Sequence, residues 1–201
     1  MKAHLQYNWW KYLAVIIIPI VLWTSVFSSM AKPKDNERLS ILFVGDGLDC
    51  RALQENMVAT IPQLTNQKIK SVKVASSVFD KDLYRKMLVS QCFDYDIIII
   101  SNSYYNEDVC KSVFRPFSEI LIEQFDTASF LLEKYGDNNL PMGIVLFDKA
   151  SNNKFVEYYS GVDACYMFFS PYSVNFSGLN GFGEIADDVA LRVAQYLLCE
   201  Q

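Results

Sequence analysis

Apolar runs alternate with helical patterns along most of the chain after residue 38. Short apolar runs predict β-strands at residues 40–44, 69–75, 95–101, 143–147 and 165–169. Between and after these runs, apolar residues recur at helical spacing, which predicts helices at residues 48–61, 81–92, 126–135 and 185–198. The four isoleucines at 97–100 are typical of a strand buried on both faces of a parallel sheet. This alternation predicts an α/β domain, specifically a three-layer sandwich with a mostly parallel central sheet.

The amino-terminal segment has a different pattern. Residues 9–30 are almost wholly apolar, with no charged residue between Tyr12 and Phe27. A run of about 20 apolar residues is long enough to cross the hydrocarbon core of a bilayer. Trp9, Trp10 and Tyr12 at one end suit the headgroup region, and Pro19 is tolerated in a membrane helix. We therefore predict an uncleaved transmembrane anchor.

A cleaved signal peptide is the alternative interpretation of the same segment. Lys2 and Lys11 would be its basic region, and Ser29-Met30-Ala31 has the small-x-small form of a cleavage site. Basic residues flank both ends of the apolar run almost equally, so the positive-inside rule does not decide the topology. Because a short tail usually stays in the cytoplasm, we expect a single-pass protein of the cell membrane with its domain on the extracytoplasmic side.

The chain thus divides into four predicted parts. Residues 1–8 form a short tail, 9–30 the anchor, 31–38 a polar linker, and 39–201 the α/β domain. We find no internal repeats and no low-complexity tract.

Composition and charge narrow the function. The net charge of −5 makes nucleic acid an unsuitable partner, because binding to phosphates needs a concentrated basic face. The single histidine, His4, precedes the domain, which excludes Ser-His-Asp and Cys-His catalysis within one chain and His-based zinc sites. The five cysteines have no C-x-x-C spacing, and we expect most to be buried apolar residues. A disulfide between Cys92 and Cys110 is the one pairing we consider.

The stretch ILFVGDGLDC, residues 41–50, has the outline of a nucleotide-binding turn. However, Cys50 takes the third small position of a dinucleotide fingerprint, and Asp46 and Asp49 would repel a pyrophosphate. We therefore expect no nucleotide and no cofactor. Gly45 and Gly47 are predicted to allow a tight strand-to-helix turn, with Asp46 or Asp49 as the helix cap. The two carboxylates alone are weak grounds for a cation site, and we predict no metal.

Three stretches carry a resemblance to a known family. They are YDIIIISNS at residues 95–103, FRPFSE at 114–119 and CYMFFSPYSVNFSGLNG at 165–181. In this order they resemble the amino-terminal lobe of bacterial extracellular solute-binding proteins, the sugar-binding partners of ABC importers. The resemblance covers about residues 39–181 and implies a periplasmic-binding-protein-like single lobe. The chain departs from the family because it has length for one lobe only and lacks the usual lipid-anchor cysteine.

Ligands of open parallel sheets sit beyond the carboxyl ends of the strands. The predicted strand ends carry polar and aromatic residues that suit a sugar, since rings stack on its C–H faces and polar groups read its hydroxyls. These candidate ligand-binding residues are Asp46, Asp49, Ser101, Asn102, Ser103, Tyr104, Tyr105, Asp148 and Tyr172. The alternative for Tyr104 and Tyr105 is that they are ordinary loop aromatics.

Two functional hypotheses follow. The first is a solute-binding-like module, accessory to a carbohydrate ABC importer, with a sugar or an importer component as its partner. The second is a structural or protein-interaction domain at the cell surface with no small ligand. Asp46 and Asp148 have the residue types of a glycosidase pair. Because the sequence shows no nucleophile–base constellation, we do not expect an enzyme.

Overall fold

The structure is a computed structural model, which describes residues 2–30, 33–114, 116–117, 130–131, 141–148, 153–175 and 189–199. The chain divides into two compact units, Met1–Lys34 and Asp35–Gln201.

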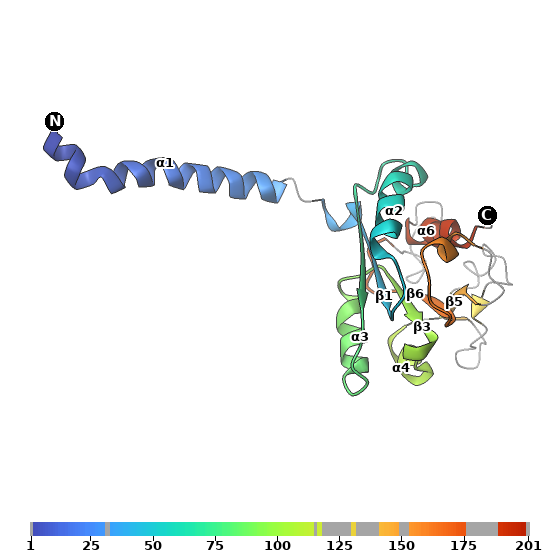
Figure 1. Cartoon of the computed structure of the whole chain (residues 1–201). Helices are drawn as coiled ribbons and strands as arrows, with labels where there is room; N and C mark the ends of the chain where they lie inside the picture. The colour runs from blue at the N-terminus through green and yellow to red at the C-terminus, as the bar shows by residue number, and fades with distance from the viewer. Residues whose placement is uncertain are drawn as a thin grey trace. The chain divides into compact units, whose positions relative to one another are not determined.

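The first unit is built on one long helix, α1 (Lys2–Met30) (Figure 1). Its segment Trp9–Phe27 has a mean hydropathy of 1.8, and none of it is buried by the protein. The hydroxyl of Thr24 donates to the carbonyl oxygen of Ile20, 2.9 Å away, so this polar group is satisfied within the helix. By length and composition, α1 can cross a membrane; an amino-terminal signal sequence shares these properties.

The second unit contains a six-stranded sheet with the strand order β2-β1-β3-β6-β5-β4. The strands are β1 (Arg38–Val44), β2 (Ser71–Ser77), β3 (Ile97–Ser101), β4 (Phe130–Leu131), β5 (Gly143–Phe147) and β6 (Cys165–Phe169). The α/β class predicted from the alternation of patterns is confirmed.

Strand direction changes halfway across the sheet. β1 pairs in parallel with β2 and with β3, with Ile41 opposite both Val74 and Ile97. β3 pairs antiparallel with β6, and the pairs β6–β5 and β5–β4 are also antiparallel. β1, β2, β3 and β5 therefore point one way, and β6 and β4 point the other. The predicted parallel arrangement holds for the β2-β1-β3 half, whereas every remaining pair of neighbouring strands is antiparallel.

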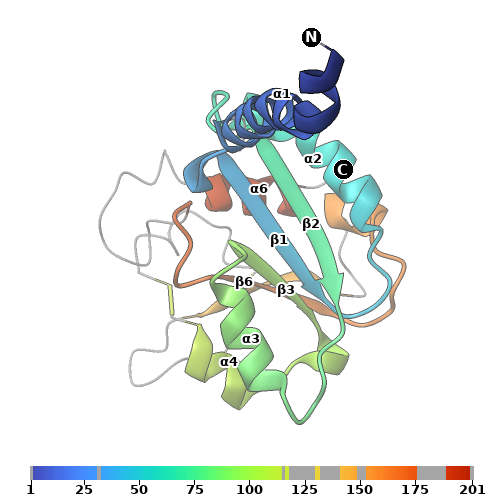
Figure 2. The same cartoon turned by 90° about the vertical axis from the view of Figure 1, so that its left-hand side faces the viewer.

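Helices pack on both faces of this sheet (Figure 2). Ile41 and Phe43 of β1 face a core shared with α2 (Cys50–Leu64) and α6 (Val189–Leu198). Leu42 and Val44 face a second core shared with α3 (Tyr84–Cys92) and α4 (Glu107–Val113). Successive side chains of a strand point to opposite faces, so β1 is buried on both sides, as are the four isoleucines of β3.

Two predicted helices differ from the structure, and a third lies partly outside the described residues. Residues 130–131 form β4, so the helix expected over 126–135 is wrong there; its other residues lie outside the described part. The helix expected from residue 81 begins at Tyr84. The Asp80 carboxylate accepts a hydrogen bond from the Asp82 N–H at 2.8 Å, and such a local turn competes with helix formation. For the final helix, residues 185–188 are likewise outside the described residues.

Candidate functional site

The glycine-containing turn after β1 has a structural cause. Gly45 and Gly47 have φ angles of +144° and +95°, which residues with a Cβ rarely adopt. A Cβ on Gly45 would lie 2.8 Å from the Cβ of Ser101. Asp49 caps α2, because its Oδ1 accepts from the Ala52 N–H at 3.0 Å. The prediction of a tight turn with an aspartate cap is therefore confirmed.

A distant segment closes this turn. Leu48 forms an isolated antiparallel bridge with Tyr159. The Asp49 N–H donates to the Tyr158 carbonyl at 2.9 Å, and the Ser160 N–H donates to the Gly47 carbonyl at 2.9 Å. The Ser160 hydroxyl also donates to the Gly47 carbonyl, at 3.0 Å. The turn is thus bound to protein backbone at the place where a phosphate cradle would present free N–H groups.

A cavity of about 490 Å³ lies between these two segments, and we call it the turn cavity. It is lined by Gly47, Leu48, Asp49, Glu157, Tyr158, Tyr159 and Ser160. Partial burial raises the pKa of Tyr158, and the nearby Glu157 carboxylate raises it further. Tyr158 thus stays a neutral phenol, able to donate and accept hydrogen bonds, beside two carboxylates that only accept them.

Tyr159 joins the turn cavity to the core. Its ring packs on Phe43, Phe147 and Phe155 with centroid separations of 5.7, 5.0 and 5.6 Å. Burial raises the pKa of Tyr159, and a hydrogen bond with the Cys165 thiol raises it further. Burial likewise raises the pKa of Cys165 to about 12. Both groups are neutral at physiological pH, so Tyr159 brings no charge to the turn cavity.

Eight of the nine predicted site residues follow strands that end at one edge, which we call the carboxyl edge. Asp46 and Asp49 follow β1, Asp148 follows β5, and residues 101–105 end and follow β3. Asp46 and Asp148 are exposed, whereas Ser101 is buried, with its hydroxyl 2.9 Å from that of Ser103. Asn102 accepts a hydrogen bond from the Tyr166 hydroxyl at 3.1 Å. Of these eight residues, only Asp49 lines the turn cavity.

Tyr104 and Tyr105 line a second, smaller cavity at the same edge. This tyrosine cavity has a volume of about 180 Å³ and is lined by Phe79, Lys81, Tyr84, Ser103, Tyr104, Tyr105 and Asn106. The Tyr105 ring packs on Tyr166 and Phe168, with centroids 4.8 and 6.2 Å apart. Asp49 lines the turn cavity, and Ser103, Tyr104 and Tyr105 line the tyrosine cavity, so the predicted residues do not converge on one hollow.

Tyr172 lies at the opposite edge, which we call the amino edge. Sequence reasoning placed it with the other residues because it follows an apolar strand. That placement is wrong, because β6 runs antiparallel to β3 and its carboxyl end meets the amino ends of β1 and β3. The periodicity of a strand carries no information about its direction.

The amino edge holds a third cavity, of about 280 Å³. This amino-edge cavity is lined by Asp35, Arg38, Ser40, Cys92, Phe93, Asp94, Tyr95, Asp96, Tyr172, Ser173 and Val174. Arg38 and Asp35 form an ion pair at 4.0 Å on its rim. The rings of Phe93 and Tyr172 stack with a centroid separation of 4.2 Å and an interplanar angle of 19°.

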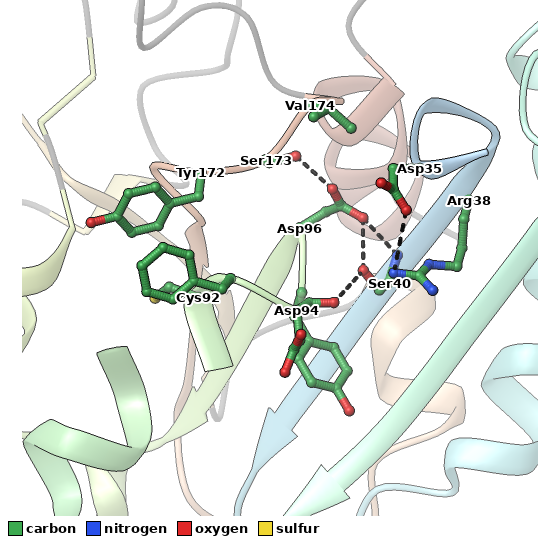
Figure 3. A pocket seen from close by; sticks show the side chains of 11 residues that line it. Asp35, Arg38, Ser40, Cys92, Asp94, Asp96, Tyr172, Ser173 and Val174 are labelled. Atoms are coloured by element: carbon green, nitrogen blue, oxygen red, sulfur yellow. Dashed lines mark hydrogen bonds and ion pairs between the residues drawn. The ribbon is translucent and has the colours of Figure 1, made fainter. Parts of the chain in front are cut away.

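A buried carboxylate organises this edge (Figure 3). Oδ2 of Asp96 accepts from the N–H and the hydroxyl of Ser40, each at 2.8 Å. Oδ1 accepts from the Ser173 hydroxyl at 2.6 Å and from the Asn175 amide at 3.2 Å. The Asn175 amide also donates to the Arg38 carbonyl at 2.8 Å. Asp96 therefore joins the start of β1 to the segment after β6, and its hydrogen bonds explain its burial.

Sequence reasoning missed both the wall of the turn cavity and Asp96. The pair Tyr158-Tyr159 with Glu157 and Ser160 has the same mix of aromatic and polar residues as residues 101–105, and this signal was available. It was overlooked because the pair follows no apolar run; it follows a short 3-10 helix, η5 (Lys154–Glu157). Asp96 gave no signal, since one aspartate before a strand is common.

The cysteines are all free thiols in the structure. Cys92 and Cys110 are both buried in the core on the α3 and α4 face, and no disulfide joins them. Burial, with a smaller contribution from nearby Cys110, raises the pKa of Cys92 to about 12. Within the described residues, no group of three or more His, Cys, Asp or Glu side chains is placed to hold a metal ion.

No protein-family model matches the chain, and no curated protein matches it. Among solved structures, the chain is similar to the substrate-binding protein PotD of a spermidine/putrescine ABC transporter from Streptococcus pneumoniae. The sequence identity is 21% and the TM-score 0.33. The match covers 55% of this chain and 32% of PotD, so the chain spans about a third of that protein. A similarity at this level carries no inference about the ligand of the present chain.

Proposed function

We propose that the chain is a non-catalytic binding domain, anchored by α1 in the cell membrane with its α/β unit on the extracytoplasmic side. In this proposal the α/β unit is a single solute-binding-like lobe. Its ligand is a carbohydrate, and its role is accessory to an ABC importer. The observation that carries the proposal is the turn cavity, where two tyrosines and two carboxylates meet at the carboxyl edge.

The chemistry of the turn cavity suits a polyhydroxylated ligand. Asp49 and Glu157 are exposed carboxylates that accept hydrogen bonds from hydroxyls. Tyr158 is half-buried and offers both a ring face and a hydroxyl. Because the backbone bonds between Gly47 and Ser160 already hold the walls together, binding need not order them, which reduces its entropic cost.

The properties of α1 support the anchor. None of the segment Trp9–Phe27 is buried by the protein, and transferring so much apolar surface from water is favourable. The anchor is tested by expressing the chain with a carboxyl-terminal tag. Retention in the membrane after alkaline extraction, with an intact mass that includes residues 1–31, supports it. Release of a shortened chain identifies α1 as a signal peptide and contradicts it.

Ligand binding is tested by thermal unfolding of the full chain in nanodiscs against mono- and oligosaccharides, with amino acids and divalent cations as comparison sets. All three tryptophans lie in α1. Unfolding of the domain is therefore followed by a maleimide dye that reacts with the buried thiols. A ligand at 100 times its Kd stabilises the fold by about 2.7 kcal/mol, which raises Tm by roughly 5 °C or more.

Three tyrosine variants place the site. Tyr158→Ala is expected to abolish the shift, whereas Tyr104→Ala in the tyrosine cavity and Tyr172→Ala at the amino edge preserve it. Loss of the shift only in Tyr104→Ala moves the site to the tyrosine cavity. No shift with any compound at millimolar concentration contradicts a small ligand and favours the protein-interaction hypothesis.

A further inference from the structure

The amino edge exposes three large apolar side chains around one cavity, which we call the aromatic patch: Phe93, Tyr172 and Val174. They are 64%, 55% and 63% exposed, and all three line the amino-edge cavity. Single exposed apolar residues are ordinary on a protein surface. These three differ from such scattered residues in two ways. They come from two segments, after α3 and after β6, and the rings of Phe93 and Tyr172 stack on each other. Stacking hides one face of each ring and leaves the remainder in water.

Hydrogen bonds that end on Asp96 and Ser170 hold the backbone of the segment after β6, one of the two segments that carry the aromatic patch. The Ser173 hydroxyl donates to buried Asp96 at 2.6 Å, and the Tyr172 N–H donates to the Ser170 hydroxyl at 3.1 Å. The Ser170 N–H in turn donates to the Asp96 carbonyl at 2.9 Å. A preordered apolar surface loses little conformational entropy when it docks. The backbone that carries Tyr172 is therefore ordered before any contact forms.

The chain ties this edge to the anchor. Asp35 lines the same cavity as the aromatic patch, and only residues 31–34 separate it from the end of α1. Five peptide steps span at most about 18 Å, so Asp35 stays within that distance of Met30, the last residue of α1. If α1 crosses a membrane, this tether keeps the amino edge at a high effective concentration near the bilayer surface.

From this placement we infer that the aromatic patch lies in the interfacial region of the bilayer that α1 crosses, with Phe93, Tyr172 and Val174 among the lipid headgroups. This inference rests on the proposed anchor. Aromatic rings favour the membrane–water interface, where one end is apolar and the other wet. The carboxyl edge, with its turn cavity, then faces away from the lipid, open to solutes.

The charges around the aromatic patch favour a zwitterionic surface. Asp35 and Asp94 are exposed on the rim, and Arg38 is paired with Asp35. Polybasic segments drive binding to anionic lipids, and the lining of this cavity carries more acidic than basic side chains. We therefore expect the contact to be apolar in origin and to form without anionic lipid.

The test places a fluorescent label at Val174 of the full chain in nanodiscs that hold one copy each. Cys50→Ser and Cys199→Ser remove the more accessible native thiols. Val174→Cys then carries an environment-sensitive dye, and phosphatidylcholine discs contain spin-labelled lipid. We expect blue-shifted emission and loss of most of the fluorescence to the lipid quencher. The matched control is Val162→Cys, 79% exposed at the carboxyl edge, which should stay unquenched.

A second pair of changes tests the cause. Phe93→Ser with Tyr172→Ser, in the Val174→Cys chain, should restore fluorescence, because it removes the apolar contact. Equal quenching at positions 174 and 162 overturns the inference, as does quenching that requires anionic lipid. An anchored chain with no quenching at 174 overturns the inference alone. A chain that loses residues 1–31 and leaves the membrane overturns it together with the proposed anchor.

Discussion

Asp96 receives two hydrogen bonds from Ser40, one from its N–H and one from its hydroxyl, although the residues are 56 positions apart. The carboxylate also accepts from Ser173 and Asn175. Two separate segments, the start of β1 and residues 173–175, therefore depend on one buried side chain. Because the Ser40 N–H is in the sheet interior, it has no alternative partner if this acceptor is lost.

We expect Asp96→Asn to lower the free energy of unfolding by about 1–3 kcal/mol, because its amide nitrogen would face groups that also donate. Asp94→Asn, at an exposed position in the same cavity lining, is the matched control and should change stability by about 0.5 kcal/mol or less. The measurement is urea unfolding followed by thiol labelling. Equal effects of the two variants would show that the Asp96 hydrogen bonds contribute no net stability.

Gly45 is expected to tolerate no side chain. Gly45→Ala forces a residue with a Cβ to φ +144° and places that Cβ 2.8 Å from Ser101, which should cost about 1–3 kcal/mol. The double variant Gly45→Ala with Ser101→Gly removes the clash with Ser101 and leaves the backbone strain, so it measures how much of the cost comes from that clash. If Gly45→Ala costs as much stability in the Ser101→Gly background as in the natural chain, the clash with Ser101 contributes nothing.

The fold should lose stability at alkaline pH. Burial raises the pKa of Cys92 and of Cys165 from 9.0 to about 12 and also raises the pKa of Tyr84 and Tyr159. A raised pKa means that the folded state holds its proton more strongly than the unfolded state. These contributions are complete below about pH 9 and decline as the pH rises toward 12.

Urea unfolding between pH 7 and 11, followed by circular dichroism, checks this sign. Cys165→Ser, which removes one of these thiols, should give a shallower decline than the unmodified chain. Stability that is constant or rises across this range would contradict the burial of these thiols.

The thiols should fall into two reactivity classes. Cys199 is exposed and Cys50 half-buried, whereas Cys92, Cys110 and Cys165 are buried. Maleimide should therefore modify two cysteines in the native chain and all five in urea, since a buried neutral thiol is a poor nucleophile. Mass spectrometry counts the adducts. Only three modified cysteines in urea without reductant would reveal a disulfide, and the prediction for free Cys92 and Cys110 would be wrong.

Local chemistry made several features readable from the sequence alone. The isoleucines at 97–100 identified a doubly buried strand because an apolar run is stable only where both faces are covered. Gly45 and Gly47 identified the turn, and Asp49 the helix cap, because these depend on neighbouring backbone geometry. The hydropathy of segment 9–27 likewise follows directly from its own residues. Such features need few distant contacts to be recognised.

Tertiary structure alone decided which of these features meet. Periodicity does not encode strand direction, so only the pairing of β6 with β3 placed Tyr172 at the amino edge beside Phe93. Similarly, only the fold brings Tyr159 to Leu48. The sequence by itself determined the elements and the local turns, since these follow from nearby residues. The cavities arise from contacts between residues far apart in the chain, and the folded packing settles those contacts.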